Sequence, residues 1–149
     1  MVIASIADTV ISCFRSGGKL LIIGNGGSAA QAQHLAGELV CSFENRERMA
    51  LPALALTTDS SILTACSNDF SFSEVFVRQI QALGKEGDVL LILSTSGKSK
   101  NCLEAEKIAL RLKLQVINFP RKGNTTAQVQ EKQLKDLHKM CRLIEQAFI

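Results

Sequence analysis

Two short apolar runs in this chain each end in a loop of small and polar residues. Residues 19–23 lead into Gly24-Asn25-Gly26-Gly27-Ser28, and residues 89–93 lead into Ser94-Thr95-Ser96-Gly97-Lys98-Ser99. Short apolar runs bounded by turn residues are typical of strands that are buried on both faces. Apolar residues at helical spacing lie between and around these runs, so strands alternate with helices. We therefore predict an α/β fold, a three-layer αβα arrangement around a doubly wound parallel sheet.

The length and composition predict one globular domain over residues 1–149 with no membrane and no nucleic-acid partner. Of the 149 residues, 46% are hydrophobic and 21% are charged, and the formal net charge is only +3. The apolar runs are far shorter than the ~20 residues that cross a bilayer. The absence of Trp and Tyr removes the best stacking surfaces for single-stranded nucleic acid. Five cysteines without a CxxC pair indicate reduced thiols, and hence a cytoplasmic location.

The remaining elements follow the same alternation of helices and strands. Ser28 with Gln31 three residues later is a capping-box pattern, and it predicts that a helix begins at Ser28. After Pro120, a final helix carries an apolar stripe that suits packing on another helix, formed by Leu134, Leu137, Cys141, Ile144 and Phe148. The expected strands span residues 19–23, 54–57, 89–93 and 115–119, and the other expected helices span 2–15, 60–84 (as one or two helices) and 101–112.

Both polar loops are expected at the carboxyl ends of their strands, where ligands bind in open parallel sheets. Glycines in the 24–28 loop let the backbone approach a ligand, and the following helix N-terminus attracts an anion. A tight strand-to-helix turn explains the same glycines, and a loose GxGxxA match keeps a dinucleotide site open. No acidic residue follows at the ~20 positions that such a site requires. Because the 94–99 loop adds hydroxyls and amides on a neighbouring strand, the two loops together favour a phosphate monoester.

Four side chains could bind a metal or move protons. His34 and Glu38 lie four residues apart on one predicted helix and share a face, while Gln130 and His138 lie on the last helix. A histidine and a carboxylate at this spacing are a common half of a zinc site. A helix-surface contact between them is the alternative, and the residues alone leave both interpretations open.

Taken together, four segments resemble the phosphoheptose isomerase family of SIS domains. They are GNGGSAAQAQHLAGELV (24–40), ALPALALTTDSSILTACSNDFSFSEVF (50–76), GKEGDVLLILSTSGKS (84–99) and TTAQVQEKQLKDLH (125–138). The resemblance implies a sheet in flavodoxin-like order and an aldose–ketose isomerase that interconverts D-sedoheptulose 7-phosphate and D-glycero-D-manno-heptose 7-phosphate through an enediol. This reaction is an early step of bacterial heptose and lipopolysaccharide biosynthesis. The resemblance also implies a homotetramer with one Zn²⁺ per subunit.

The family's functional residues are carried over by position, so their roles here are expectations. The metal ligands fall on His34, Glu38, Gln130 and His138. The general base falls on Glu38 and the general acid on His138, which suits proton transfer between adjacent carbons. Because a carboxylate bound to zinc is a weaker base, either Glu38 leaves the metal when substrate binds or zinc mainly organises the site. The substrate-binding positions fall on Asn25, Gly26, Gly27, Ser28, Asp59, Ser94, Thr95, Ser96, Ser99 and Gln130.

The chain also departs from the family pattern. Gln128 and Ser42 stand where family members carry arginines, and the stretch near 120–125 is short, so we expect a further segment there. Gln130 and His138 are ~12 Å apart along a helix, so we expect a partner chain to supply one of them and the final helix, with its apolar stripe, to pack on symmetry mates.

The alternatives from other classes are a non-catalytic SIS protein of the DnaA initiator-associating type and a sugar-phosphate-sensing SIS domain. An NAD-dependent oxidoreductase is more distant.

Overall fold

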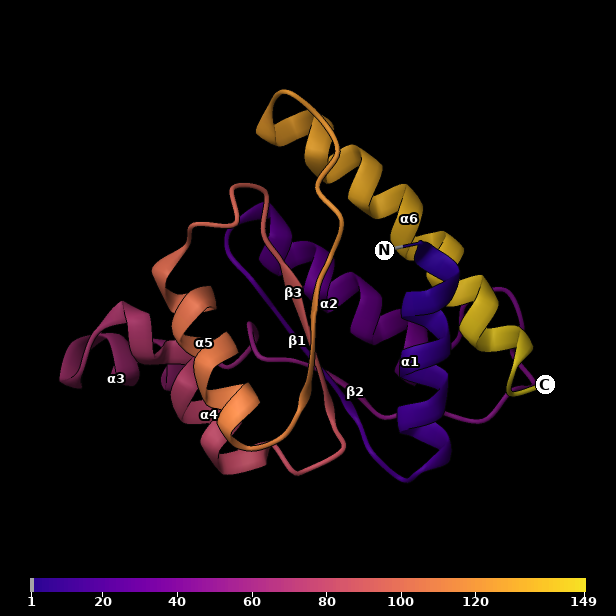
Figure 1. The fold of residues 1–149 in the computed structure, drawn as a ribbon, viewed down its shortest axis with the longest axis horizontal. Coiled ribbons are helices and arrows are strands. Elements are labelled where there is room, and N and C mark those ends of the chain that lie inside the picture. The colour runs from indigo at the N-terminus through magenta and orange to yellow at the C-terminus, as the bar shows by residue number, and fades with distance from the viewer. Residues whose placement is uncertain (1) are drawn as a thin grey trace.

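A parallel four-stranded sheet lies between two layers of helices in the computed structural model, which describes residues 2–149 (Figure 1). The strand order is β2-β1-β3-β4, and every neighbouring pair is parallel. This confirms the predicted αβα architecture and the flavodoxin-like order. The strands are β1 (Leu20–Gly24), β2 (Ala53–Ala55), β3 (Val89–Leu93) and β4 (Gln115–Asn118).

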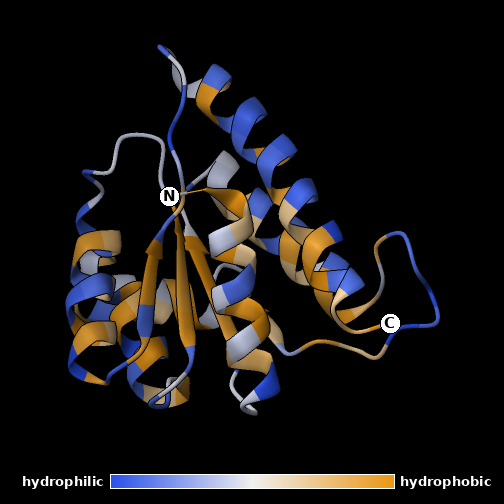
Figure 2. Ribbon diagram, turned by 45° about the vertical axis from the view of Figure 1, so that its right-hand side comes forward, coloured by the Kyte–Doolittle hydropathy of each residue, from blue (hydrophilic) through white to orange (hydrophobic). Residues whose placement is uncertain are grey.

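The helices divide into two groups that cover opposite faces of the sheet (Figures 1 and 2). One group is α1 (Ile3–Arg15), α2 (Gly27–Val40) and α6 (Thr126–Gln146), and the other is α3 (Ser60–Asp69), the 3₁₀ turn η1 (Phe72–Glu74), α4 (Val75–Leu83) and α5 (Lys100–Arg111).

Alternate residues of the central strands enter two separate cores. In β1, Leu20 and Ile22 belong to the core under α1, α2 and α6, whereas Leu21 and Ile23 belong to the core under α3, α4 and α5. Both faces of the strand are therefore apolar, which explains why its sequence is a continuous run rather than an alternation. Burying each such side chain contributes roughly 1.5–3 kcal/mol. The polar loops after β1 and β3 are thus held on a rigid base.

The apolar stripe of α6 is used inside the chain. Leu137, Cys141 and Ile144 are buried in the same core as residues of α1 and α2. These residues of the stripe therefore pack inside the chain on α1 and α2, and the packing of α6 on symmetry mates stays a prediction. Figure 2 shows the apolar side of α6 turned toward these helices and a largely hydrophilic outer side.

The capping-box prediction for α2 is also wrong. The helix begins at Gly27, and its N-cap is Gly26, whose φ of 55° lies in the left-handed region that glycine adopts without strain. Gln31 does not reach back to the helix start, because its amide donates instead to the carbonyl oxygen of Gln130 on α6 at 2.7 Å. Ser28 is buried within the first turn.

Between β4 and α6 the chain runs directly through residues 119–125 as an irregular connection. The further segment expected there stays a prediction. In the part of the chain that the structure describes, no helix combines the length and the apolar character needed to cross a membrane.

Candidate active site

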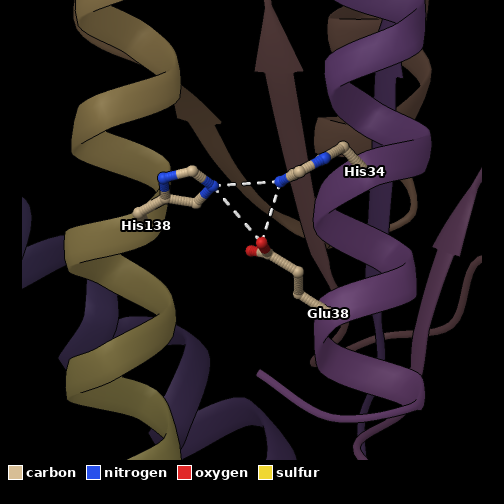
Figure 3. Close-up of side chains that lie close together, drawn as sticks. All are labelled: His34, Glu38 and His138. Atoms are coloured by element: carbon tan, nitrogen blue, oxygen red, sulfur yellow. Dashed lines mark hydrogen bonds and ion pairs between the residues drawn. The ribbon is translucent and has the colours of Figure 1, made fainter. Parts of the chain in front are cut away.

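His34 and Glu38 of α2 face His138 of α6 across the gap between the two helices (Figure 3). Glu38 Oε1 lies 2.8 Å from His34 Nε2 and 3.3 Å from His138 Nε2, and the two imidazole nitrogens are 3.0 Å apart. His34 and Glu38 share a face of α2 because they are four residues apart. Two helices that are adjacent in the same layer thus bring together side chains separated by about a hundred positions in the sequence.

The chemistry of these three side chains fits a divalent metal ion. Their donor atoms all lie within 4.8 Å of one another. Imidazole nitrogens and a carboxylate oxygen are ligands that Zn²⁺ accepts, and metal–ligand bonds of ~2.0–2.2 Å place neighbouring donors at about the separations found here. The side chains of His34 and His138 are 46% and 37% exposed, so a ligand can enter from solvent.

Gln130, the fourth residue of the expected ligand set, lies elsewhere in this chain. Its side-chain amide packs against Gly27 at the start of α2, about two helical turns from His34. The structure therefore brings together His34, Glu38 and His138 within one chain and separates Gln130 from them.

The second oxygen of Glu38 has its own partner, Cys141. The thiol of Cys141, one turn beyond His138 on α6, donates to Glu38 Oε2 at 3.1 Å. Burial raises the pKa of this thiol, and the hydrogen bond to the Glu38 carboxylate raises it further. The thiol therefore stays protonated at neutral pH and is a donor rather than a thiolate.

A buried ion pair supports the end of α2 on which Glu38 lies. The Arg48 guanidinium donates to Glu145 of α6 at 3.1 Å, and it also donates to the backbone carbonyl of Glu38. Glu145 accepts from the backbone N–H groups of Phe43 and Glu44 as well. Burial alone would raise the pKa of Glu145, but these N–H donors and Arg48 outweigh it, so the pKa is lowered.

An aromatic side chain borders His138. The Phe43 ring stacks on the His138 imidazole with ring centroids 5.6 Å apart. The Arg142 guanidinium lies over the Phe43 ring, 5.7 Å from its centroid. Phe43 belongs to the connection after α2 that the Arg48–Glu145 pair anchors. This contact limits the orientations that the imidazole can adopt.

The glycine loop and the start of α5 are joined by a reciprocal pair of amides. Asn25 donates to Asn101 at 2.9 Å, and Asn101 donates back at 2.8 Å. Asn101 is buried, and its oxygen also accepts from the N–H of Cys102. The Asn25 amide, expected at the substrate, is therefore engaged in fixing the glycine loop against the first turn of α5.

The hydroxyls of the 94–99 loop shape the loop itself. Ser94 Oγ accepts from the N–H of Gly97 at 2.9 Å, and Ser96 Oγ accepts from the N–H of Lys98 at 3.1 Å. Ser99 is the N-cap residue of α5 and makes no side-chain cap bond. Thr95 and Ser96 line a hollow of about 180 Å³ together with residues 123–126 and Val129. The loop, the helix N-terminus and this hollow suit an anion.

A guanidinium lies over the same loop. Gly97 has a φ of 68°, and a side chain at this position would collide with the Arg121 guanidinium. The missing Cβ therefore allows a cation to approach the backbone of the hydroxyl loop. Asp59, in contrast, is the N-cap of α3, and its carboxylate accepts from the N–H of Ile62 at 2.9 Å.

Comparison with known proteins identifies the family to which this fold belongs. The SIS domain family profile matches residues 1–119. Phosphoheptose isomerase 1 of Campylobacter jejuni is 43% identical over 98% of this chain and 87% of its own length, and a phosphoheptose isomerase of Roseiflexus is 44% identical over 96% and 80%. The structure of the Neisseria gonorrhoeae phosphoheptose isomerase superposes with a TM-score of 0.89 at 39% identity, covering 97% of this chain and 85% of that one. The chain belongs to the phosphoheptose isomerase family.

The alignment with the Campylobacter phosphoheptose isomerase runs over 162 positions, more than the 149 residues of this chain. That relative therefore carries residues that have no counterpart here. Four residues that support the site of this phosphoheptose isomerase family member were not predicted from its sequence, namely Arg48, Asn101, Arg121 and Glu145. Arg48 and Glu145 belong to no recognisable sequence motif. Asn101 could have been found, because it lies just after the 94–99 loop at the start of α5.

Proposed function

We propose that this protein is an isomerase that interconverts D-sedoheptulose 7-phosphate and D-glycero-D-manno-heptose 7-phosphate. The observation that carries the proposal is the meeting of a carboxylate and two imidazoles between α2 and α6. Its support is the hydroxyl loop and glycine loop at the carboxyl end of the sheet, in a chain that shares 43% identity with a phosphoheptose isomerase. The reaction belongs to an early step of bacterial heptose and lipopolysaccharide biosynthesis, and we place the enzyme in the cytoplasm.

The reaction moves a proton between adjacent carbons through an enediol, so it needs a base and a group that moves protons between oxygens. We assign Glu38 as the base that removes the proton from carbon. His138, whose Nε2 lies 3.3 Å from the same carboxylate oxygen, is the acid that serves the sugar oxygens when this nitrogen carries a proton rather than the metal. Phe43, stacked on the imidazole, holds it in that position.

We further propose one Zn²⁺ per subunit, held by His34, Glu38 and His138. When bound, the ion supplies a Lewis acid that stabilises negative charge on the sugar oxygens. Gln130 is assigned as a ligand or substrate contact that a neighbouring subunit of a homotetramer contributes, because its own chain places it against Gly27. Gly26, Gly27, Ser28, Asp59 and Ser99 remain assigned to substrate binding beside Thr95 and Ser96.

The decisive experiment incubates the purified protein with sedoheptulose 7-phosphate, with and without a chelator, and follows aldose phosphate by NMR. We expect conversion that the chelator abolishes and that added Zn²⁺ restores. Binding of the sugar phosphate without conversion would instead support a sensing domain. Failure both to bind and to convert would favour the initiator-associating type of SIS protein.

The phosphate contacts give a separate prediction. Replacing Ser96 and Ser99 together with alanine is expected to raise KM by roughly 10-fold or more, because each lost hydrogen bond to a charged group contributes ~1.5–3 kcal/mol. The change in kcat should be smaller, since neither residue touches the reacting carbons. Steady-state kinetics with sedoheptulose 7-phosphate measure both quantities. Ser67→Ala, an exposed serine on α3, is the matched control, and an unchanged KM in the double variant would contradict the site.

The arrangement within one chain gives a prediction about mixed subunits. Glu38 and His138 meet inside one chain, so mixing the inactive variants Glu38→Gln and His138→Ala should restore no activity even after subunit exchange. A mixture of Glu38→Gln with Gln130→Ala is expected to regain part of the activity, because the second pair is supplied by different subunits. Exchange is verified with differently tagged chains and native mass spectrometry. Recovery in the first mixture would show that α6 reaches a neighbour's α2.

A further inference from the structure

Cys141 was part of an apolar stripe in the sequence, yet its sulfur faces the carboxylate that we assign as the base. The side chain is only 1% exposed, and its thiol donates to Glu38 Oε2 at 3.1 Å. The other carboxylate oxygen, Oε1, faces the imidazoles of His34 and His138. The two oxygens of Glu38 therefore have different partners, and only one of them is turned toward the open side of the site.

This division matters because a carboxylate can rotate about its last side-chain bond. The Glu38 side chain is only 15% exposed, so water has limited access to the carboxylate to replace a lost donor. A buried acceptor without a partner is unfavourable by roughly 1–3 kcal/mol, and rotation of the carboxylate is one way to relieve it. A donor fixed on Oε2 therefore fixes the direction of Oε1.

The thiol is in a position to act as this donor and not as a metal ligand. Among residues 2–149, His34, Glu38 and His138 form the only group of three or more His, Cys, Asp or Glu side chains that could hold a metal ion, and Cys141 does not join it. Cys141 is three residues beyond His138, so one face of α6 presents the imidazole and the thiol to the same carboxylate. Partners of ligating carboxylates commonly set ligand orientation in this way.

We propose that Cys141 is a positioning residue, whose S–H group holds the Glu38 carboxylate so that Oε1 points at the reacting carbon and at the metal position. The inference rests on the proposed function for its effect on turnover. Its effect on metal affinity does not depend on turnover, because the direction of Oε1 is needed to hold the ion whether or not a sugar is converted.

The test compares three substitutions that differ in volume and in the ability to donate. Cys141→Val fills the space with a slightly larger apolar side chain and removes the donor, Cys141→Ala removes both the bulk and the donor, and Cys141→Ser restores a donor. We expect the valine and alanine variants to lower kcat and Zn²⁺ affinity by roughly 10-fold. This is the lower end of the effect of losing a hydrogen-bond partner of a metal ligand, because S–H is a weak donor. KM should change less than kcat, since no phosphate contact is lost. Serine is expected to stay within about 3-fold of the unsubstituted protein.

Cys13→Ala is the matched control, because Cys13 is a buried thiol of the same core that donates to the carbonyl of Lys19 and does not contact Glu38. It should lower thermal stability about as much as Cys141→Ala and leave kcat and metal affinity unchanged. Zn²⁺ affinity is measured by competition with a chromophoric chelator, and the Co²⁺ form is examined for sulfur-to-metal charge-transfer bands, which we expect to be absent.

The possible failures are distinguishable. An unsubstituted protein that binds Zn²⁺ but does not convert sedoheptulose 7-phosphate would overturn the proposed function. The Zn²⁺ affinities of the Cys141 variants would then still test the positioning role. Valine and serine variants with equal kcat and equal Zn²⁺ affinity would overturn the positioning role. Charge-transfer bands that disappear in Cys141→Ser would overturn it as well, because they would make Cys141 a ligand.

Discussion

Replacing Glu38 with glutamine is expected to lower kcat by roughly 10²–10⁴, because the amide keeps the shape of the side chain but cannot accept the proton from carbon. Glutamine retains an oxygen that can face His34 and His138, so part of the metal affinity should survive. The measurement is steady-state turnover of sedoheptulose 7-phosphate at saturating Zn²⁺, with metal content determined on the same samples.

Glu104→Gln is a suitable control for this substitution. Glu104 lies on α5, in the helix layer on the other face of the sheet, and among residues 2–149 its one ion pair is with Lys107 at the surface. Its replacement should leave kcat unchanged. If Glu38→Gln turns over at a near-normal rate with its metal retained, Glu38 is not the base, and that role must be assigned to another group.

Replacing Glu145 with glutamine is expected to lower the free energy of unfolding at neutral pH by roughly 3–5 kcal/mol. The Arg48 and Glu145 side chains are 1% and 5% exposed, so the substitution leaves a guanidinium buried without its counter-charge. Urea denaturation of the metal-free protein measures the change. Because Arg48 also donates to the Glu38 carbonyl, we expect the loosened connection after α2 to reduce Zn²⁺ affinity too.

Two comparisons separate this effect from a general loss of charge. Glu44→Gln breaks only the exposed pair with Arg142 and should change stability little. The double variant Arg48→Met/Glu145→Gln removes both buried charges and is expected to be more stable than Glu145→Gln alone. A single variant that is as stable as the unsubstituted protein would show that the pair contributes nothing.

The same carboxylate predicts how stability depends on pH. The pKa of Glu145 is lowered in the folded state, so its contribution is present above the ordinary glutamate value of about 4.3 and is lost as the pH falls below that value. The unsubstituted protein should therefore lose stability more steeply than Glu145→Gln in this acid range. Parallel slopes for the two proteins below about pH 4.3 would contradict the assignment.

The sequence by itself determined the alternation of strands and helices and the placement of both polar loops. Local periodicity is enough for this, because a strand buried on both faces must be apolar throughout, as residues 89–93 are. His34 and Glu38 were also predictable as a pair, since four residues bring two side chains to one face of any helix. The family resemblance added the role of His138 and the reaction, which no periodicity could supply.

Only the tertiary structure decided which distant side chains meet. The stripe containing Cys141 is the same pattern whether it covers a neighbouring chain or α1 and α2, and the structure places it against α1 and α2. Arg48 and Glu145 look like surface charges in the sequence, yet the packing of α6 beside α2 buries them as a pair. Such contacts depend on where whole helices lie rather than on local spacing. The support beneath Glu38 therefore became visible only once the chain was folded.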